Sequence, residues 1–252
     1  MRLKKGATVS DEAQPAQTPT KKRIDITFDF RSDTPPGKDP DAFSPTLRRY
    51  HKLLWSKTLP SGVAFALDDR GPDYLYHRSE LGEFWLASDA VISSFTREGR
   101  ISHIIDQIPM EEQNAFNALG YTIGGMMVFP GNCIGRKLTI NGARGLHPRI
   151  KDRFDLTVEC IRRHYSKESN PLGAVLERYR DFFQLFRHFR GYVEFFLLQD
   201  LVNEDSSAVE FFLPLEDFPT WPLPASVAAY EEYRERAEGF IRARNQRILR
   251  SC

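Results

Sequence analysis

Residues 120–165, GYTIGGMMVFPGNCIGRKLTINGARGLHPRIKDRFDLTVECIRRHY, carry the strongest structural pattern in this sequence. Apolar residues between glycines predict a strand over 121–129. A loop rich in Gly, Asn and Arg follows over 130–147, and Pro148 then predicts the start of a charged amphipathic helix. Loops held by rigid elements carry much of the chemistry of proteins. We therefore expect a functional site at this junction.

Five residues of this region are candidates for binding a ligand. Asn141 and Arg144 lie in the glycine-rich segment just before the predicted helix, and Arg153 follows them. Free backbone N–H groups, an arginine fork and a helix N-terminus together suit a phosphate or a carboxylate. Gly124 and Gly125 weaken the predicted strand unless another backbone or a ligand approaches closely. No nucleotide-binding glycine motif is present, and a plain turn, with Arg144 paired to an acidic residue elsewhere, explains the loop equally well.

Acidic residues recur along the predicted helix at steps of three and four. Asp152, Asp155 and Glu159 therefore share one face with Arg162 and Arg163. Ion pairs within the helix, each worth about 0.2–0.5 kcal/mol, explain Asp152. Asp155 and Glu159 remain candidates for catalysis because they lie beside the glycine-rich loop.

Three aspartates further upstream, Asp33, Asp39 and Asp41, surround a glycine in a proline-rich loop. Their spacing is not that of a calcium-binding EF-hand loop, and aspartate is favoured in turns for its own hydrogen bonding. We interpret the three as turn residues and assign no metal site to the sequence.

The rest of the chain alternates between strand and helix patterns. Alternating apolar residues predict strands, and a capping residue followed by proline or by acidic residues predicts a helix start. A single compact α+β domain over residues 24–252 follows, with a mixed or antiparallel sheet, hairpins, several helices and a long C-terminal helix. The expected strands cover residues 24–30 and 63–67, a hairpin within 74–95 and a hairpin over 192–202 and 209–215; the expected helices cover 45–57, 101–119 with a break at Pro109, 171–190 and the chain after Ser226.

Composition and length are those of an ordinary soluble protein. Of the 252 residues, 41% are hydrophobic and 27% are charged. No apolar run reaches about 18 residues, so we expect no membrane partner. Cys133, Cys160 and Cys252 have neither zinc-ligand spacing nor an even count, which favours a reducing compartment and a cytoplasmic location.

Charge is unevenly distributed along the chain, although its net value is only +1. Residues 1–23 carry six basic and two acidic residues and lack an apolar period, so we expect a disordered basic tail, for which nucleic-acid contact stays open. Residues 144–190 carry 11 basic and 6 acidic residues (+5), whereas residues 191–240 carry 2 and 11 (−9). The two segments complement each other, within one molecule or between subunits.

His77 ends a predicted strand in the pattern Leu75-Tyr76-His77. This pattern resembles the first motif of ADP-ribosyltransferase-type folds, in which a His or Arg holds the nicotinamide ribose. The resemblance implies that residues 124–129 supply the glycine-containing strand and that Glu210 supplies the late glutamate. The small residues that usually follow the histidine are absent here.

Taken as a whole, the sequence resembles an uncharacterised family of cytosolic bacterial or phage-borne proteins. The resemblance runs from about Phe28 to Ile248. It implies no activity and no active-site residue. Its most recognisable pieces are DPDAFSPTLRRYHKLLWSK, YTIGGMMVFPG, INGARG, DRFDLTVECIRRHY and GYVEFFLLQDLV.

Two hypotheses of function follow from these patterns. The first is a soluble enzyme acting on an anionic, nucleotide-like substrate, with no cofactor assigned. In that case His77 and residues 141–153 should line one pocket, with Arg144 partly exposed and unpaired. The alternative is a non-catalytic binding or regulatory protein that works through complementary charged surfaces; complete acid–arginine pairing without an adjoining cleft favours it. The candidate catalytic residues of the first hypothesis are His77, Asp155, Glu159 and Glu210.

Overall fold

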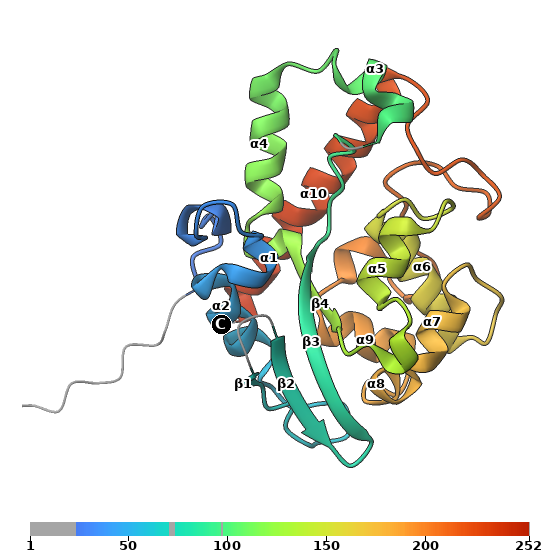
Figure 1. Cartoon of the computed structure of the whole chain (residues 1–252). Helices are drawn as coiled ribbons and strands as arrows, with labels where there is room; N and C mark the ends of the chain where they lie inside the picture. The colour runs from blue at the N-terminus through green and yellow to red at the C-terminus, as the bar shows by residue number, and fades with distance from the viewer. Residues whose placement is uncertain (1–23, 71–73, 97, 252) are drawn as a thin grey trace, which may run out of the picture.

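The computed structural model describes residues 24–70, 74–96 and 98–251, so the expected basic tail lies outside the described residues. The described residues form one compact α+β domain, as predicted, in which a single sheet packs against helices (Figure 1). No helix of this part is long and apolar enough to cross a membrane.

The sheet has four strands in the order β1-β2-β3-β4, and each neighbouring pair is antiparallel. The predicted hairpin is confirmed as β2 (Tyr74–Ser79) and β3 (Gly82–Ala90). β1 (Asp68–Arg70) lies at one edge of the sheet and pairs with β2. β4 (Met126–Pro130) pairs with the second half of β3 and forms the other edge; the sequence predicted a strand over 121–129, but its first half turns at Ile123–Gly125 instead.

Helices make up most of the remaining chain. The predicted helix after Ser44 and the long helix after Ser226 are confirmed, and each serine accepts a hydrogen bond from the first turn. The predicted break near Pro109 is also confirmed, whereas the predicted helix over 171–190 is divided at Tyr179. The helices are α1 (Pro40–Phe43), α2 (Pro45–Trp55), α3 (Ser102–Ile105), α4 (Met110–Gly120), α5 (Ile140–Leu146), α6 (Phe154–Tyr165), α7 (Gly173–Arg178), α8 (Arg180–Gln184), α9 (Phe189–Phe195) and α10 (Val227–Ser251).

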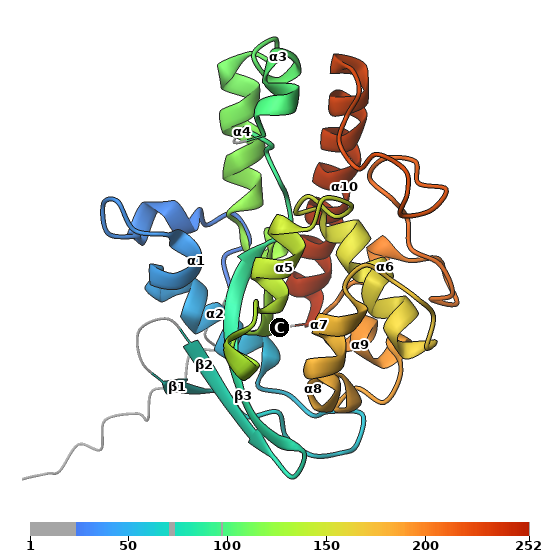
Figure 2. The same cartoon turned by 45° about the vertical axis from the view of Figure 1, so that its right-hand side comes forward.

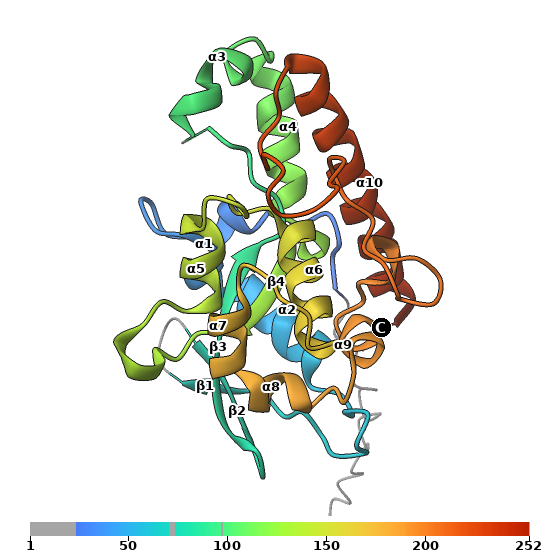
Figure 3. The same cartoon turned by 90° about the vertical axis from the view of Figure 1, so that its right-hand side faces the viewer.

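The helices surround the sheet unevenly. In Figures 1 and 2 strand β3 runs through the middle of the molecule, with α1 and α2 on one side and α5 to α9 on the other. Figure 3 shows α3, α4 and the first half of α10 extending beyond the sheet as an arm. The sites considered below lie on the body of the molecule and at the base and tip of this arm.

Two predicted strands in the first third of the chain do not form. Residues 24–30 bury Ile24 and Phe30, as their alternation predicts. Their backbone turns instead of pairing, because the side chains of Asp25 and Asp29 accept hydrogen bonds from the N–H groups two residues on. Residues 63–67 make only an isolated bridge to the chain before them.

The predicted hairpin over 192–202 and 209–215 is also wrong, because these segments share only one isolated bridge. His188 starts helix α9 by accepting a hydrogen bond from the N–H of Gly191. Aromatic residues favour strands on average, but here their packing against α8 decides the outcome. The cluster contains Phe182, Phe183, Phe186, Tyr192, Phe195 and Phe196.

Residues 130–153 differ most from the prediction. The glycine-rich segment expected to be a loop forms helix α5, capped by Thr139, whose side chain accepts from the N–H of Gly142. Pro148 opens no helix, because Lys151 and Asp152 have φ values of 49° and 63°, in the left-handed region. Helix α6 therefore begins only at Phe154.

Gly124 and Gly125 lie where the backbone is most crowded. A Cβ atom on Gly125 would stand 2.0 Å from the carbonyl oxygen of Gly120, and one on Gly124 would stand 2.6 Å from that of Ile241. Close backbone packing, the first of the two explanations considered above, therefore accounts for both glycines.

Arg244 joins α10 to the sheet from inside the core. It is fully buried, and its guanidinium donates to the carbonyl oxygens of Phe196, Gly124 and Met126. It also lies 5.8 Å from the ring centre of Trp55. No ion pair to Arg244 forms among the described residues, so carbonyl dipoles and an aromatic ring stabilise its charge.

Candidate functional site

Arg144, the central residue of the predicted anion site, is fully buried and ion-paired. Its guanidinium forms salt bridges with Asp89 at the end of β3 and with Asp152, the latter at 3.1 Å between Nη1 and Oδ1. It also donates to the backbone carbonyls of Asp152 and Ala90. The expectation that Arg144 is partly exposed and unpaired is therefore wrong. The alternative, in which Arg144 pairs with an acid elsewhere in the chain, describes it correctly.

Asn141 lies one turn before Arg144 on helix α5. Its Nδ2 donates to the carbonyl oxygen of Ser88 at 3.3 Å. Its Oδ1 is buried and finds no hydrogen-bond partner within the described ranges. Asn141 and Arg144 together tie α5 to the end of β3, so the structure does bring these two predicted residues together.

Arg153 and Asp155 form a second buried pair, at the start of α6. Arg153 also donates to the carbonyl oxygens of Leu213 and Pro222, and Asp155 accepts from the backbone N–H of Phe212. The pair therefore fixes the segment before α10 against α6, and neither side chain reaches solvent.

Glu159 belongs to the row of ion pairs that its spacing predicts. Its carboxylate pairs with Arg162 at 2.8 Å and with Arg163 at 2.7 Å. Arg163 reaches further and pairs with Asp217 at 3.0 Å. The intrahelical interpretation is correct for Glu159, whereas Asp152 pairs outside the helix, with Arg144.

His77 is buried between aromatic rings on β2, with its ring centre 4.0 Å from that of Phe65. Its Nδ1 lies 2.9 Å from the carbonyl oxygen of Ala66, which can only accept, so Nδ1 carries the proton. Burial lowers the pKa of His77, which keeps the ring neutral. Glu210 is exposed on another segment, next to the isolated bridge.

The shared pocket expected for His77 and residues 141–153 is not formed. Of the three cavities described below, none is lined by both, and Arg144 faces carboxylates instead of a cleft. The predicted site residues therefore separate into a buried ion pair at Arg144, a buried ion pair at Arg153 and a row of ion pairs at Glu159. His77 and Glu210 lie apart from these groups and from each other.

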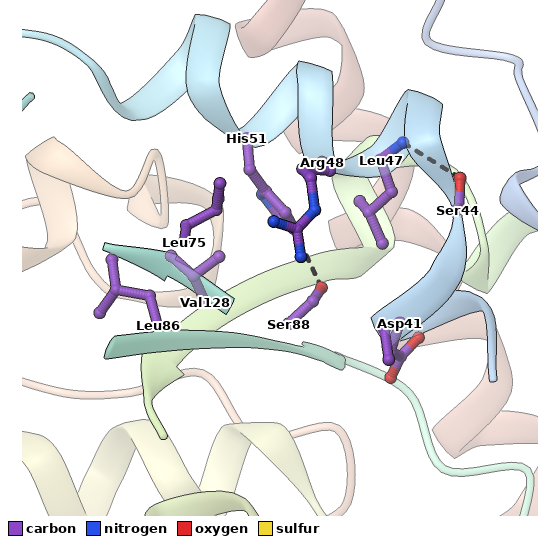
Figure 4. A pocket seen from close by; sticks show the side chains of 10 residues that line it. Asp41, Ser44, Leu47, Arg48, His51, Leu75, Leu86, Ser88 and Val128 are labelled. Atoms are coloured by element: carbon purple, nitrogen blue, oxygen red, sulfur yellow. Dashed lines mark hydrogen bonds between the residues drawn. The ribbon is translucent and has the colours of Figure 1, made fainter. Parts of the chain in front are cut away.

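A small cavity of about 20 Å³ lies between α1, α2 and the sheet (Figure 4). Figure 4 shows Asp41, Arg48, His51 and Ser88 around it. A volume of this size holds about one water molecule and excludes larger ligands.

His51 and Ser88 contact each other beside this cavity, with Nε2 and Oγ 2.9 Å apart. The indole N–H of Trp55 donates to Nδ1 of His51 at 3.0 Å, so Nδ1 accepts and the ring proton lies on Nε2. Nε2 therefore donates to Ser88 and cannot remove its proton, which excludes Ser–His nucleophilic catalysis in this arrangement. Burial lowers the pKa of His51 to about 3, so the ring stays neutral at pH 7.

Two of the three upstream aspartates accept hydrogen bonds at the starts of α1 and α2. Asp33 accepts from the hydroxyl of Ser44 and the N–H of Thr46, and Asp39 accepts from the N–H of Asp41. Within residues 24–70, 74–96 and 98–251, no group of three His, Cys, Asp or Glu side chains is arranged to hold a metal ion.

An open groove of about 470 Å³ lies between the α5–α6 connection, the end of α6 and residues 217–219. This volume is in the range of small-molecule sites. Pro148, Pro171 and Pro219 supply apolar walls, and polar groups lie between them. The polar residues of the groove are His147, Arg149, Arg163, Ser169, Asn170 and Asp217.

Two arginines dominate the charge of this groove and differ in their surroundings. Arg163 is held by two carboxylates, and its guanidinium lies 4.7 Å from the ring centre of Phe218. Arg149 is exposed and makes no ion pair with any described residue. Nδ1 of His147 accepts the backbone N–H of Arg149 at 3.2 Å, and burial together with the charge of Arg149 lowers the pKa of His147. The ring is therefore neutral at pH 7, with its proton on Nε2.

A third cavity, of about 550 Å³, lies at the tip of the arm, between α3 and α4. Ile105 and Ile108 line it, and Met110 at its edge is 67% exposed. Among the residues that the structure describes, no basic side chain lines this cavity.

Sequence reasoning missed the groove because its walls come from three separate segments. The sequence pattern placed Arg163 on the predicted helix, but Asp217 and Phe218 lie more than 50 residues later. His51 could have been noticed, because its spacing of four from Trp55 places the two on one helix face.

Comparison with known proteins identifies a family and no function. No curated protein and no solved structure matches this chain. A family model described as a family of unknown function (DUF6994) matches residues 24–248. The match covers most of the chain, so the chain belongs to this family. The matched residues include every strand of the sheet and the buried ion pairs of Arg144 and Arg153.

Proposed function

We propose that this protein is a non-catalytic binding protein that takes an anionic small molecule, of about nucleotide size, in the groove beside Arg149. One observation carries the proposal. Arg149 is an exposed guanidinium without an ion-pair partner among the described residues, and it lies at a groove large enough for such a ligand. A cytosolic bacterial or phage setting is part of the proposal and rests on sequence resemblance alone.

The groove offers the contacts that such a ligand needs. A guanidinium fork matches the oxygens of a phosphate or a carboxylate in a bidentate arrangement. The Nε2–H of neutral His147, which also lines the groove, is a second donor. Pro148, Pro171 and Pro219 present flat apolar surfaces that suit a planar ring such as a nucleobase.

Ion pairing supports binding over catalysis. Asp155 and Glu159 were the candidate acids and bases nearest this region, and both are neutralised by arginines. A general base must reach the proton that it removes, and Asp155 is fully buried away from the groove. An enzyme of the ADP-ribosyltransferase type would depend on His77 and Glu210, which no described cavity brings together.

A thermal-shift screen tests the proposal. A ligand that binds only the folded state raises the unfolding temperature, so the full chain is heated with inorganic phosphate, mononucleotides, dinucleotides and their uncharged nucleosides. We expect a shift with at least one anion and none with its nucleoside. Arg149→Ala should abolish the shift, whereas Arg250→Ala should keep it, because Arg250 is an exposed arginine at the end of α10 that makes no ion pair with a described residue. An equal shift in both variants would place the ligand elsewhere.

A further inference from the structure

Asp217 lies in the groove beside Arg149 and pairs there with a second arginine. Its Oδ1 lies 3.0 Å from Nη2 of Arg163, and 56% of its side chain is exposed. The other partner of Arg163 is Glu159, which contacts Nε at 2.7 Å from within α6 and is only 6% exposed. Arg163 is therefore held by one buried carboxylate and by one that lines the groove.

The neighbours of Asp217 fix its position. Phe218 is buried, and its ring centre lies 4.7 Å from the guanidinium of Arg163. The carbonyl oxygen of Asp217 accepts the N–H of Thr220 at 2.8 Å, which closes a turn over residues 217–220. These contacts hold the carboxylate in the groove beside Arg163.

The charges that line the groove are nearly balanced. Within the described part of the chain they belong to Arg149, Arg163 and Asp217. The backbone N–H of Phe218 is the main cause that lowers the pKa of Asp217, and the charges of Arg163 and Arg149 act in the same direction, so Asp217 is ionised at pH 7. Because two carboxylates already offset Arg163, Arg149 is the cation of this lining that a ligand can neutralise.

We propose that Asp217 makes the groove selective for an anionic group with one charge, a phosphodiester or a carboxylate, over a terminal phosphate with two. Arg149 neutralises the first charge. A second charge has no free cation in the described lining and is repelled by the carboxylate of Asp217. The inference rests on the proposed anion site and adds the class of ligand that this site takes.

Three small probes separate charge from shape. Dimethyl phosphate carries one charge, whereas methyl phosphate has a second pKa of about 6 and carries two charges at pH 8. Acetate is a singly charged carboxylate. Each is titrated into the full chain at pH 8 and constant ionic strength, because salt screens exposed charges. The NMR signals of the Nε–H groups of Arg149 and Arg163 report where the probe binds and how tightly.

In the wild type we expect dimethyl phosphate to bind more tightly than methyl phosphate and to shift the signal of Arg149. Asp217→Asn removes the charge but keeps an oxygen that can accept from Arg163. It should raise the affinity for methyl phosphate relative to dimethyl phosphate roughly two- to fivefold, the effect of one exposed charge pair. Glu216→Gln removes the same charge from an exposed side chain outside the groove lining and should leave this ratio unchanged.

Acetate should respond to Asp217→Asn as dimethyl phosphate does, and the tighter of these two probes identifies the ligand as a carboxylate or a phosphodiester. An equal ratio in the wild type and Asp217→Asn, or the same change in Glu216→Gln, would overturn the inference while the Arg149 site stands. If none of the three probes shifts the signal of Arg149, the anion site itself is refuted, and this inference with it.

Discussion

Arg244 offers the strongest test of how the core is held together. Replacing it with methionine keeps much of the side-chain volume and removes every donor. In the wild type the guanidinium donates to the carbonyl oxygens of Phe196, Gly124 and Met126 at 2.8–3.3 Å. Methionine has no hydrogen-bond donor, so these three buried carbonyl oxygens lose the donor that Arg244 supplies.

The magnitude follows from these three acceptors. Each buried polar group left unsatisfied costs about 1–3 kcal/mol, so the gross loss is about 3–9 kcal/mol. Removing a buried charge that has no carboxylate partner among the described residues returns part of this, since burial lowers the pKa of Arg244 to about 10. We expect a net loss of at least about 3 kcal/mol, a large share of the 5–15 kcal/mol typical of a folded domain.

Urea unfolding followed by tryptophan fluorescence measures this loss, because Trp55 lies beside the guanidinium. Arg242→Met is the matched control. It lies on the exposed side of the same helix, where it pairs with Glu238, so its loss should stay below about 1 kcal/mol. Equal stabilities of Arg244→Met and the control would refute the role of Arg244 in the core.

Two further predictions concern the backbone and the acid range. Gly125→Ala should prevent folding or lower the unfolding temperature sharply, because its Cβ would stand 2.0 Å from the Gly120 carbonyl oxygen. Gly239→Ala in α10, with open space around its Cβ, should be neutral or slightly stabilising. Circular dichroism melting measures both changes. His51 alone should lower the wild-type free energy of unfolding by about 1.4 kcal/mol per pH unit as the pH drops from 6.5 towards 3. The reason is that the folded pKa of His51 is depressed, so the unfolded chain takes up the proton first. His51→Gln should remove that component in urea titrations while still accepting from Trp55, and an unchanged acid slope would contradict it.

Local signals predicted the parts of the fold that depend on local chemistry. Ser44 before Pro45 and Ser226 before α10 marked helix starts, and the hairpin of β2 and β3 followed from its alternation. Residues 24–30 show the limit of alternation, because side-chain burial was predicted correctly while the backbone followed the Asx turns of Asp25 and Asp29. The alternation of a segment fixes which side chains point inward, but a strand also needs a partner.

The candidate site was less predictable because charge partners come from distant segments. Glycines suggested a loop around Arg144, yet burial of Ile140 and Arg144 stabilises a helix there despite weak propensity. One of the two carboxylate partners of Arg144 is Asp89, 55 residues earlier, which no local pattern connects to it. The groove likewise needs Asp217 from beyond α9. Local patterns identified the charged residues, and only the tertiary structure shows which of them remain unpaired.

The central claim is that the unpaired guanidinium of Arg149 binds an anion, and calorimetric titration tests it most directly. The anion that gives the largest thermal shift is titrated into the wild type, Arg149→Ala and Arg250→Ala. A hydrogen bond to a charged group contributes about 1.5–3 kcal/mol, so the dissociation constant of Arg149→Ala should rise by roughly 10- to 150-fold. Arg250→Ala should bind as the wild type does. Equal affinity of Arg149→Ala and the wild type would contradict the claim.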